Sequence, residues 1–140
     1  MVRVMAFGTF DLVHPGHIRY LKMAKKLGTE LIVVIARDDS VKRIKGKKAL
    51  FNESERLELI SSLKFVDKAV LGHDFVKDKS QIVGEHWPDV IALGYDQKPS
   101  NEQLRKELLL KINWQGKIVR LKPKKHEEYK TSRIKKLLEI

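Results

Sequence analysis

The chain opens on an almost uninterrupted apolar run, Val2–Phe7, which leads directly into a Gly-Thr-Phe-Asp turn at residues 8–11. A strand that is apolar at nearly every position is buried on both faces, which is typical of a parallel sheet covered by helices on both sides. The run therefore predicts a central strand of an α/β fold.

Strands and helices are predicted to alternate along the rest of the chain. Short apolar segments predict four more strands, at Glu30–Ala36, Lys68–Leu71, Asp89–Leu93 and Lys117–Leu121. Helical spacing or a capping residue predicts five helices, at Ile18–Leu27, Asn52–Leu63, Ser80–His86, Asn101–Asn113 and Thr131–Ile140. We therefore predict a Rossmann-like, doubly wound, five-stranded parallel sheet in a single domain spanning residues 1–140.

The turn after the first strand ends in His14-Pro15-Gly16-His17, at the expected start of a helix. Proline and glycine let the chain turn tightly into the helix, whose N-terminus attracts anions. Spacing of i, i+3 allows both imidazoles to point to the same side. We predict a polyphosphate site here. The alternative is that both histidines only cap or pack the helix.

A basic segment follows the second strand, with Lys42, Arg43, Lys45, Lys47 and Lys48 within seven residues. We expect a mobile loop whose lysines neutralise phosphate, because lysine acts as a point charge for phosphate groups. A solvated loop without a ligand is the alternative. A nucleic-acid patch is disfavoured, because no aromatic residue is interleaved to stack on bases.

Two further segments are expected at the carboxyl edge of the sheet, where ligands bind in folds of this kind. Gly94 and Asp96 follow the fourth strand, and Asp96 is suited to accept from a ribose hydroxyl or a base amino group. A turn residue is the other interpretation of Asp96. Thr131 or Ser132 is a natural N-cap for the last helix, with or without a ligand.

Composition limits the possible classes of protein. The net charge is +11, and charged residues make up 34% of the chain. A basic protein can bind nucleic acid, an acidic membrane surface or a small anionic substrate. Absence of cysteine excludes thiolate catalysis and disulfides. No apolar run is long enough for a membrane span, and no signal peptide precedes the first strand, so we expect a cytoplasmic protein without a membrane partner.

The Gly8-Thr-Phe-Asp turn followed by His14-x-Gly-His17 resembles the signature of the nucleotidyltransferase superfamily. Gly94-Tyr-Asp-Gln97 and the segments around Ile32 and Val66 narrow the resemblance to archaeal-type FAD synthetases. The resemblance spans nearly the whole chain and implies transfer of AMP from ATP to FMN.

This resemblance also implies roles for individual residues. The catalytic pair would be His14 and His17, and Asp11 would hold Mg²⁺ or another divalent metal, directly or through water. The nucleotide would contact residues at four places, namely Thr9, Phe10, Asp11, His14, Pro15, Gly16, His17, Gly94, Asp96, Tyr129, Thr131 and Ser132. Basic contacts to phosphate would come from Lys42, Lys45, Lys47 and Arg56. We expect a homodimer that acts on ATP and FMN and does not bind nucleic acid.

Three alternatives to this function remain at the level of sequence. Glycerol-3-phosphate cytidylyltransferase is the main rival, although residues 125–132 depart from the C-terminal motif of that family. A nucleotide- or nucleic-acid-binding module without catalysis would explain the charge. A relative of class I aminoacyl-tRNA synthetases would share the histidine motif, but 140 residues leave no room for tRNA recognition.

Overall fold

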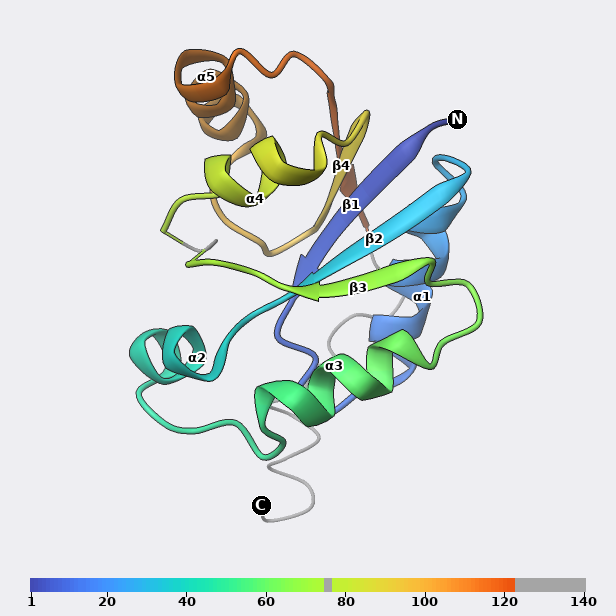
Figure 1. The fold of residues 1–140 in the computed structure, drawn as a ribbon, viewed down its shortest axis with the longest axis vertical. Helices are drawn as coiled ribbons and strands as arrows, with labels where there is room; N and C mark the ends of the chain where they lie inside the picture. Colours follow the sequence, from blue (N-terminus) through green and yellow to red (C-terminus); the bar gives the residue numbers. More distant parts are fainter. Residues whose placement is uncertain (75–76, 123–140) are drawn as a thin grey trace.

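The computed structural model describes residues 1–74 and 77–122, which form one α/β unit around a five-stranded parallel sheet (Figure 1). The strands are β1 (Arg3–Gly8), β2 (Glu30–Ile35), β3 (Lys68–Leu71), β4 (Val90–Gly94) and β5 (Lys117–Leu121). Their order in the sheet is β3-β2-β1-β4-β5. The predicted fold class is confirmed, with β1 at the centre.

Five helices are described: α1 (Pro15–Lys25), α2 (Asp38–Lys45), α3 (Glu53–Ser61), α4 (Ser80–His86) and α5 (Asn101–Ile112). Four of them lie where the sequence predicted a helix: α4 has the predicted bounds, and the ends of α1, α3 and α5 differ by at most three residues. The helix predicted at Thr131–Ile140 lies outside the described residues. No helix in the part of the chain that the structure describes is long and apolar enough to cross a membrane.

The basic segment after β2 was expected to be a loop, and this prediction was wrong: most of it is α2. Asp38 and Asp39 lie in the first turn of the helix, whereas Lys42 and Lys45 lie in the last. This order of charges stabilises a helix, because the helix dipole is positive at its N-terminus and negative at its C-terminus. Gly46 ends the helix with a φ of 74°. The two aspartates before the lysines were the sequence signal for this helix.

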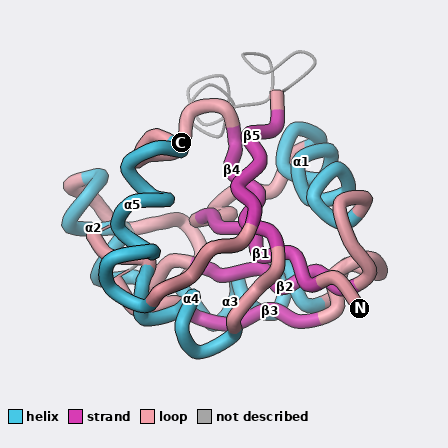
Figure 2. Tube along the Cα trace, turned by 90° about the horizontal axis from the view of Figure 1, so that it is seen from above, coloured by secondary structure: helices cyan, strands magenta, loops and turns pink. Residues whose placement is uncertain are grey.

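Helices cover both faces of the sheet (Figure 2). Successive side chains of β1 point to opposite faces: Val4 and Ala6 pack on the side of α1 and α3, and Met5 and Phe7 on the side of α4 and α5. All four are buried, with at most 1% exposed. Burial on both faces is the reason that the first strand is apolar at nearly every position.

The chain reverses its direction of travel across the sheet between β1 and β4. From β1 it moves outward through β2 to β3, and then crosses back to place β4 on the other side of β1. Pairing of β1 with β2 continues to Gly8, whereas pairing of β1 with β4 ends at Ala6 opposite Ala92. The two strands therefore separate at their carboxyl ends, at the point where ligands bind in doubly wound sheets.

Candidate active site

The turn after β1 is held in place by the core. Phe10 has a φ of 54°, and its side chain is 3% exposed. A Cβ on Gly8 would lie 2.5 Å from the Phe10 ring, so the end of β1 requires glycine. The Phe10 ring meets the His17 ring at 73°, with 5.4 Å between the ring centroids. The side chain of Phe10 therefore packs against the His17 ring inside the protein. A nucleotide would contact the backbone of the turn and not this side chain.

The two histidines form the N-terminal cap of α1. The Nδ1 atom of His14 accepts a hydrogen bond from the backbone N–H of Gly16 at 3.1 Å. The Nδ1 atom of His17 accepts from the backbone N–H of His14 at 3.4 Å. The two rings stack with 3.8 Å between their centroids. Because both Nδ1 atoms act as acceptors, each neutral imidazole carries its proton on Nε2.

Both imidazoles are neutral at physiological pH. Burial lowers the pKa of His14 below its ordinary value. Burial lowers the pKa of His17 to about 3, with further contributions from the positive charge that His14 carries when it is protonated and from Lys45. The pair therefore offers two Nε2–H donors at a helix N-terminus, where Pro15 occupies the first position. Such donors stabilise negative charge without carrying a charge of their own.

Asp11 has a structural function that the sequence did not predict. The carboxylate is 2% exposed, and its two oxygens accept from the backbone N–H groups of Leu50 and Phe51, each at 3.0 Å. These bonds tie the segment between α2 and α3 to the turn after β1. Direct ligation of a metal by Asp11 fits this arrangement poorly, because the metal would compete with both N–H groups. Within residues 1–74 and 77–122, no three potential ligands cluster as a metal site.

Arg56 also differs from expectation, because its guanidinium faces the protein interior. The side chain is 0% exposed. Its Nε donates to the carbonyl of Phe51 at 3.0 Å, and one terminal nitrogen donates to the carbonyls of Thr9 and Ala36 at 2.9 and 2.7 Å. The other terminal nitrogen pairs with Asp38 at 2.8 Å. Arg56 therefore joins the ends of β1 and β2 to α2, and none of its side chain is exposed in this arrangement.

The predicted lysines of α2 and the following segment lie on the surface. Lys42, Lys45 and Lys47 are all exposed. The positive charge of Lys45 contributes to the lowered pKa of His17, so the end of α2 lies within electrostatic range of the histidine pair. Arg43 instead forms an ion pair with Asp74 at 2.5 Å. The structure thus brings at least one predicted lysine to the histidines.

Gly94 ends β4 and Asp96 follows two residues later, at the carboxyl edge that also carries the histidine turn after the parallel strand β1. The carbonyl of Gly94 accepts from Arg120 at 2.8 Å, and its N–H donates to the Gln97 side chain at 3.0 Å. The sequence analysis did not select Gln97 or Arg120 as functional residues. Two signals were available: a glutamine after Gly94-x-Asp, and an arginine between the apolar residues Val119 and Leu121 of β5. Tyr129, Thr131 and Ser132 lie outside the described residues.

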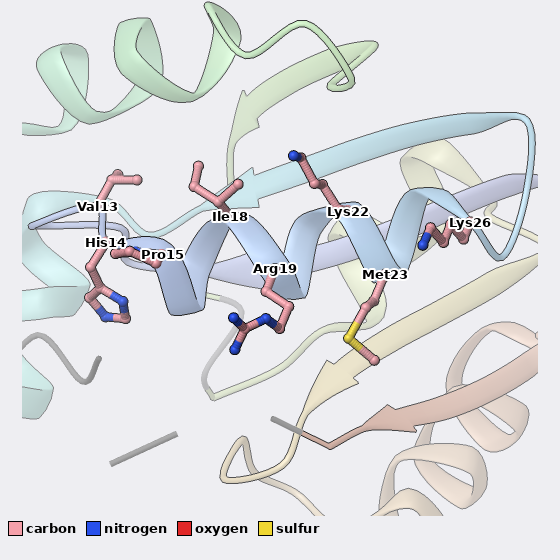
Figure 3. A pocket seen from close by; sticks show the side chains of 8 residues that line it. All are labelled: Val13, His14, Pro15, Ile18, Arg19, Lys22, Met23 and Lys26. Carbon is pink, nitrogen blue, oxygen red and sulfur yellow. The ribbon is translucent and has the colours of Figure 1, made fainter. Parts of the chain in front are cut away.

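A groove of about 590 Å³ begins at His14 and follows the outer face of α1 (Figure 3). Apolar side chains of Val13, Ile18 and Met23 line it together with basic ones. The basic lining residues are Arg19, Lys22 and Lys26. The groove thus continues from the histidine pair along the length of the helix.

Comparison with known proteins shows the family of this chain. A family model described as Cytidylyltransferase-like matches residues 5–137. The chain therefore belongs to the cytidylyltransferase-like family of nucleotidyltransferases, as the histidine motif predicted. An FAD synthase from Thermoplasma acidophilum is 50% identical over 121 residues, which cover 86% of this chain and 82% of that protein. An FAD synthase from Archaeoglobus profundus is 46% identical over 144 residues, covering 100% and 88%.

A solved structure is also similar along most of the chain. The crystal structure described as a lipopolysaccharide core biosynthesis protein from Thermoplasma volcanium has 52% sequence identity and a TM-score of 0.79. The match covers 86% of this chain and 96% of that one. The predicted resemblance to archaeal FAD synthases is confirmed by the curated relatives.

Proposed function

We infer that this protein is an FAD synthase, which transfers the AMP group of ATP to FMN and releases pyrophosphate. The observation that carries this inference is the pair of histidines whose Nδ1 atoms accept backbone hydrogen bonds at the N-terminus of α1, at the edge where β1 and β4 separate. Curated FAD synthases that are 46–50% identical support the choice of substrates. ATP and FMN are both anions, in agreement with the net charge of +11.

We propose that the nucleotide lies across the separated ends of β1 and β4. The backbone of Thr9 and Phe10 and the residues His14–His17 would hold the triphosphate, because the helix N-terminus and the imidazole donors favour negative charge there. Gly94 and Asp96 would meet the ribose or the base. The predicted contacts of Tyr129, Thr131 and Ser132 with the β- and γ-phosphates remain part of the proposal.

The chemistry needs no general base. The phosphate of FMN is a monoester with a second pKa of about 6, so it is largely dianionic at neutral pH and can attack the α-phosphorus directly. Attack forms a new P–O bond to FMN and breaks the bond to the leaving pyrophosphate. Negative charge grows on the α-phosphate oxygens and on pyrophosphate. The Nε2–H groups of His14 and His17 would stabilise this charge in the transition state.

The exposed lysines of α2 and the following segment would attract and orient both substrates. We propose that Lys45, whose charge acts on His17, contacts phosphate, and that Lys42 and Lys47 add to the positive field. Arg56 would act indirectly, by fixing the turn after β1 and the start of α2.

We propose that Mg²⁺ or another divalent metal accompanies the triphosphate. Mg²⁺ keeps several waters and is commonly bound through substrate phosphates. The metal would neutralise part of the negative charge on pyrophosphate as it leaves. The carboxylate of Asp11 is occupied by two backbone N–H groups, so it would contact the metal only through water.

One assay tests the function. Purified protein with Mg²⁺ is incubated with ATP or CTP, and with FMN or glycerol 3-phosphate, while products are separated by chromatography and pyrophosphate is measured. We expect FAD from ATP plus FMN, and a weaker reaction with CTP, because adenine and cytosine both present an amino group beside a ring nitrogen. CDP-glycerol without FAD would overturn the choice of substrates and favour the cytidylyltransferase alternative.

We also propose that the protein is a homodimer that does not bind nucleic acid. Leu109 and Leu110 of α5 are 44% and 75% exposed, and an interface would cover them. Light scattering during gel filtration should give twice the mass of one chain. A mass of 16.2 kDa, the mass of one chain, would contradict the dimer.

A further inference from the structure

The ladder between β1 and β4 is interrupted at Phe7, although the two strands continue. Direct pairing ends with Ala6 opposite Ala92. In a continued parallel ladder, Phe7 would donate its N–H to the carbonyl of Ala92 and accept from the N–H of Gly94. Both of these bonds are replaced in the structure by bonds to side chains.

Tyr20 of α1 replaces the first missing bond. Its hydroxyl accepts from the backbone N–H of Phe7 at 3.3 Å and donates to the carbonyl of Ala92 at 2.7 Å. Burial raises the pKa of Tyr20, so the hydroxyl stays protonated and is able to donate. The hydroxyl oxygen therefore lies between the two strands as a bridge.

Gln97 replaces the second missing bond. Its Nε2 donates to the carbonyl of Phe7 at 2.7 Å, and its Oε1 accepts from the N–H of Gly94 at 3.0 Å. The carboxamide thus presents one donor and one acceptor, as a backbone peptide group would. Only glutamine and asparagine carry a carboxamide, and asparagine is one methylene shorter.

The two bridges differ in length, and this difference opens the strands progressively. A hydroxyl places one heavy atom between two backbone groups, whereas a carboxamide places three. The gap between β1 and β4 therefore widens from the Tyr20 bridge to the Gln97 bridge, toward the carboxyl edge where the histidines lie. Both bridges satisfy backbone groups that would otherwise lack a partner at the split.

Arg120 of β5 fixes the loop that carries Gln97. Its guanidinium donates to the carbonyls of Gly94, Gln97 and Pro99, and to the side chain of Asn101. The planar fork of arginine matches several acceptors at once, which lysine cannot do. The Gln97 carboxamide is therefore presented on a loop that is already held.

We propose that Tyr20 and Gln97 are positioning residues that hold β1 apart from β4 and set the width of the crevice that receives the nucleotide. The proposal rests on the proposed function, which places the nucleotide at this split. Neither side chain needs to touch ATP. Without the bridges, Phe7 would pair directly with β4, and the crevice would narrow before ATP binds.

Calorimetric titration with ATP in the absence of FMN tests the effect of the two bridges on ATP binding, without requiring turnover. The variants are Tyr20→Phe, which loses only the hydroxyl, and Gln97→Glu, which keeps the shape but cannot donate to the Phe7 carbonyl. Each is expected to weaken ATP binding by about tenfold, the effect of about 1.4 kcal/mol. KM for FMN should change less than twofold. Gln115→Glu, on an exposed loop, is the matched control and should leave both values unchanged.

Three outcomes decide the proposal. Unchanged ATP affinity in a folded Tyr20→Phe variant would overturn it, whatever Gln97→Glu does. A lower kcat with unchanged ATP affinity would also overturn it, because the side chains would then act on the chemical step. The proposal would be confirmed if Tyr20→Phe and Gln97→Glu each lose ATP affinity and the double variant loses less than the sum of the two losses. Such a result would mean that the two bridges act together. Absence of FAD formation by the wild-type protein would instead contradict the proposed function, independently of these titrations.

Discussion

His14 and His17 each combine two functions that the sequence analysis treated as alternatives. Their Nδ1 atoms cap the helix, and this capping fixes the proton on Nε2, where a phosphate would be met. Helix capping and hydrogen-bond donation are therefore not alternatives, because the hydrogen bond at one ring nitrogen determines whether the other nitrogen carries the proton. The same bonds fix the orientation of the rings before substrate binds.

Substitution of His14 separates capping from catalysis. Asparagine is a good N-cap but lacks an Nε2 donor, whereas alanine lacks both. We expect His14→Asn and His14→Ala to lower kcat by at least ~10², the scale for loss of one transition-state donor. Only His14→Ala should also lose about 1 kcal/mol of stability, the usual contribution of a cap. Steady-state FAD formation and thermal melting measure the two effects, and near-wild-type turnover of His14→Asn would refute a catalytic His14.

The low pKa of His17 makes stability depend on pH. Its pKa is about 3 in the folded state and near 6.5 in an unfolded chain. The folded state therefore binds fewer protons between these values, so the contribution to stability is complete above pH 6.5 and is lost as pH falls toward 3. Urea unfolding of the wild-type protein should show a falling free energy of unfolding from pH 7 to 5. His17→Gln, which does not titrate, should show a shallower fall; equal slopes would mean that His17 is not perturbed.

At the scale of elements, α2 and α3 hold the carboxyl edge of the sheet in shape. Arg56 of α3 bonds to the ends of β1 and β2 and pairs with Asp38 at the start of α2. Asp11 ties the segment between the two helices to the turn after β1. The basic residues of α2 are thereby carried on a helix whose start is anchored, and not on a free loop.

Arg56→Lys should mainly destabilise the fold. Lysine keeps the charge but cannot replace a fork that bonds to three carbonyls and a carboxylate. Loss of two or more buried hydrogen bonds is expected to cost about 2–4 kcal/mol of unfolding free energy, measured by urea titration. An unchanged urea midpoint combined with a raised KM for ATP would show that Arg56 contacts phosphate, as the sequence analysis expected.

Removal of positive charge beside His17 should weaken substrate binding without unfolding the protein. Lys45→Ala with Lys47→Ala is expected to raise KM for ATP or FMN by about tenfold, because each lysine contributes to the field around the phosphates. Melting temperature should change little, since both side chains are exposed. The control is Lys64→Ala with Lys68→Ala, which removes equal charge at the opposite edge of the sheet, where β3 begins. A comparable rise in KM for the control would show a general charge effect.

At the scale of the whole molecule, the order of the strands creates the site. Reversal of the chain between β1 and β4 brings the histidine turn and the Gly94–Asp96 segment to one edge, although about 80 residues separate them in the sequence. Bridges from Tyr20 and Gln97 keep this edge open. The fold thus supplies a crevice with a helix N-terminus beside it, which is the arrangement that phosphate binding favours.

The sequence by itself determined the order and type of most elements and the location of the histidine motif. These features depend on local patterns: apolar runs, helical spacing, and a capping segment within four residues. The pattern that predicts α2, acidic residues followed by basic ones, is also local, although it was missed. Only the tertiary structure decided what Asp11, Arg56 and Gln97 do. Their partners lie 39–40, up to 47 and up to 90 residues away, and residue spacing does not indicate which distant carbonyl or N–H group a side chain will meet.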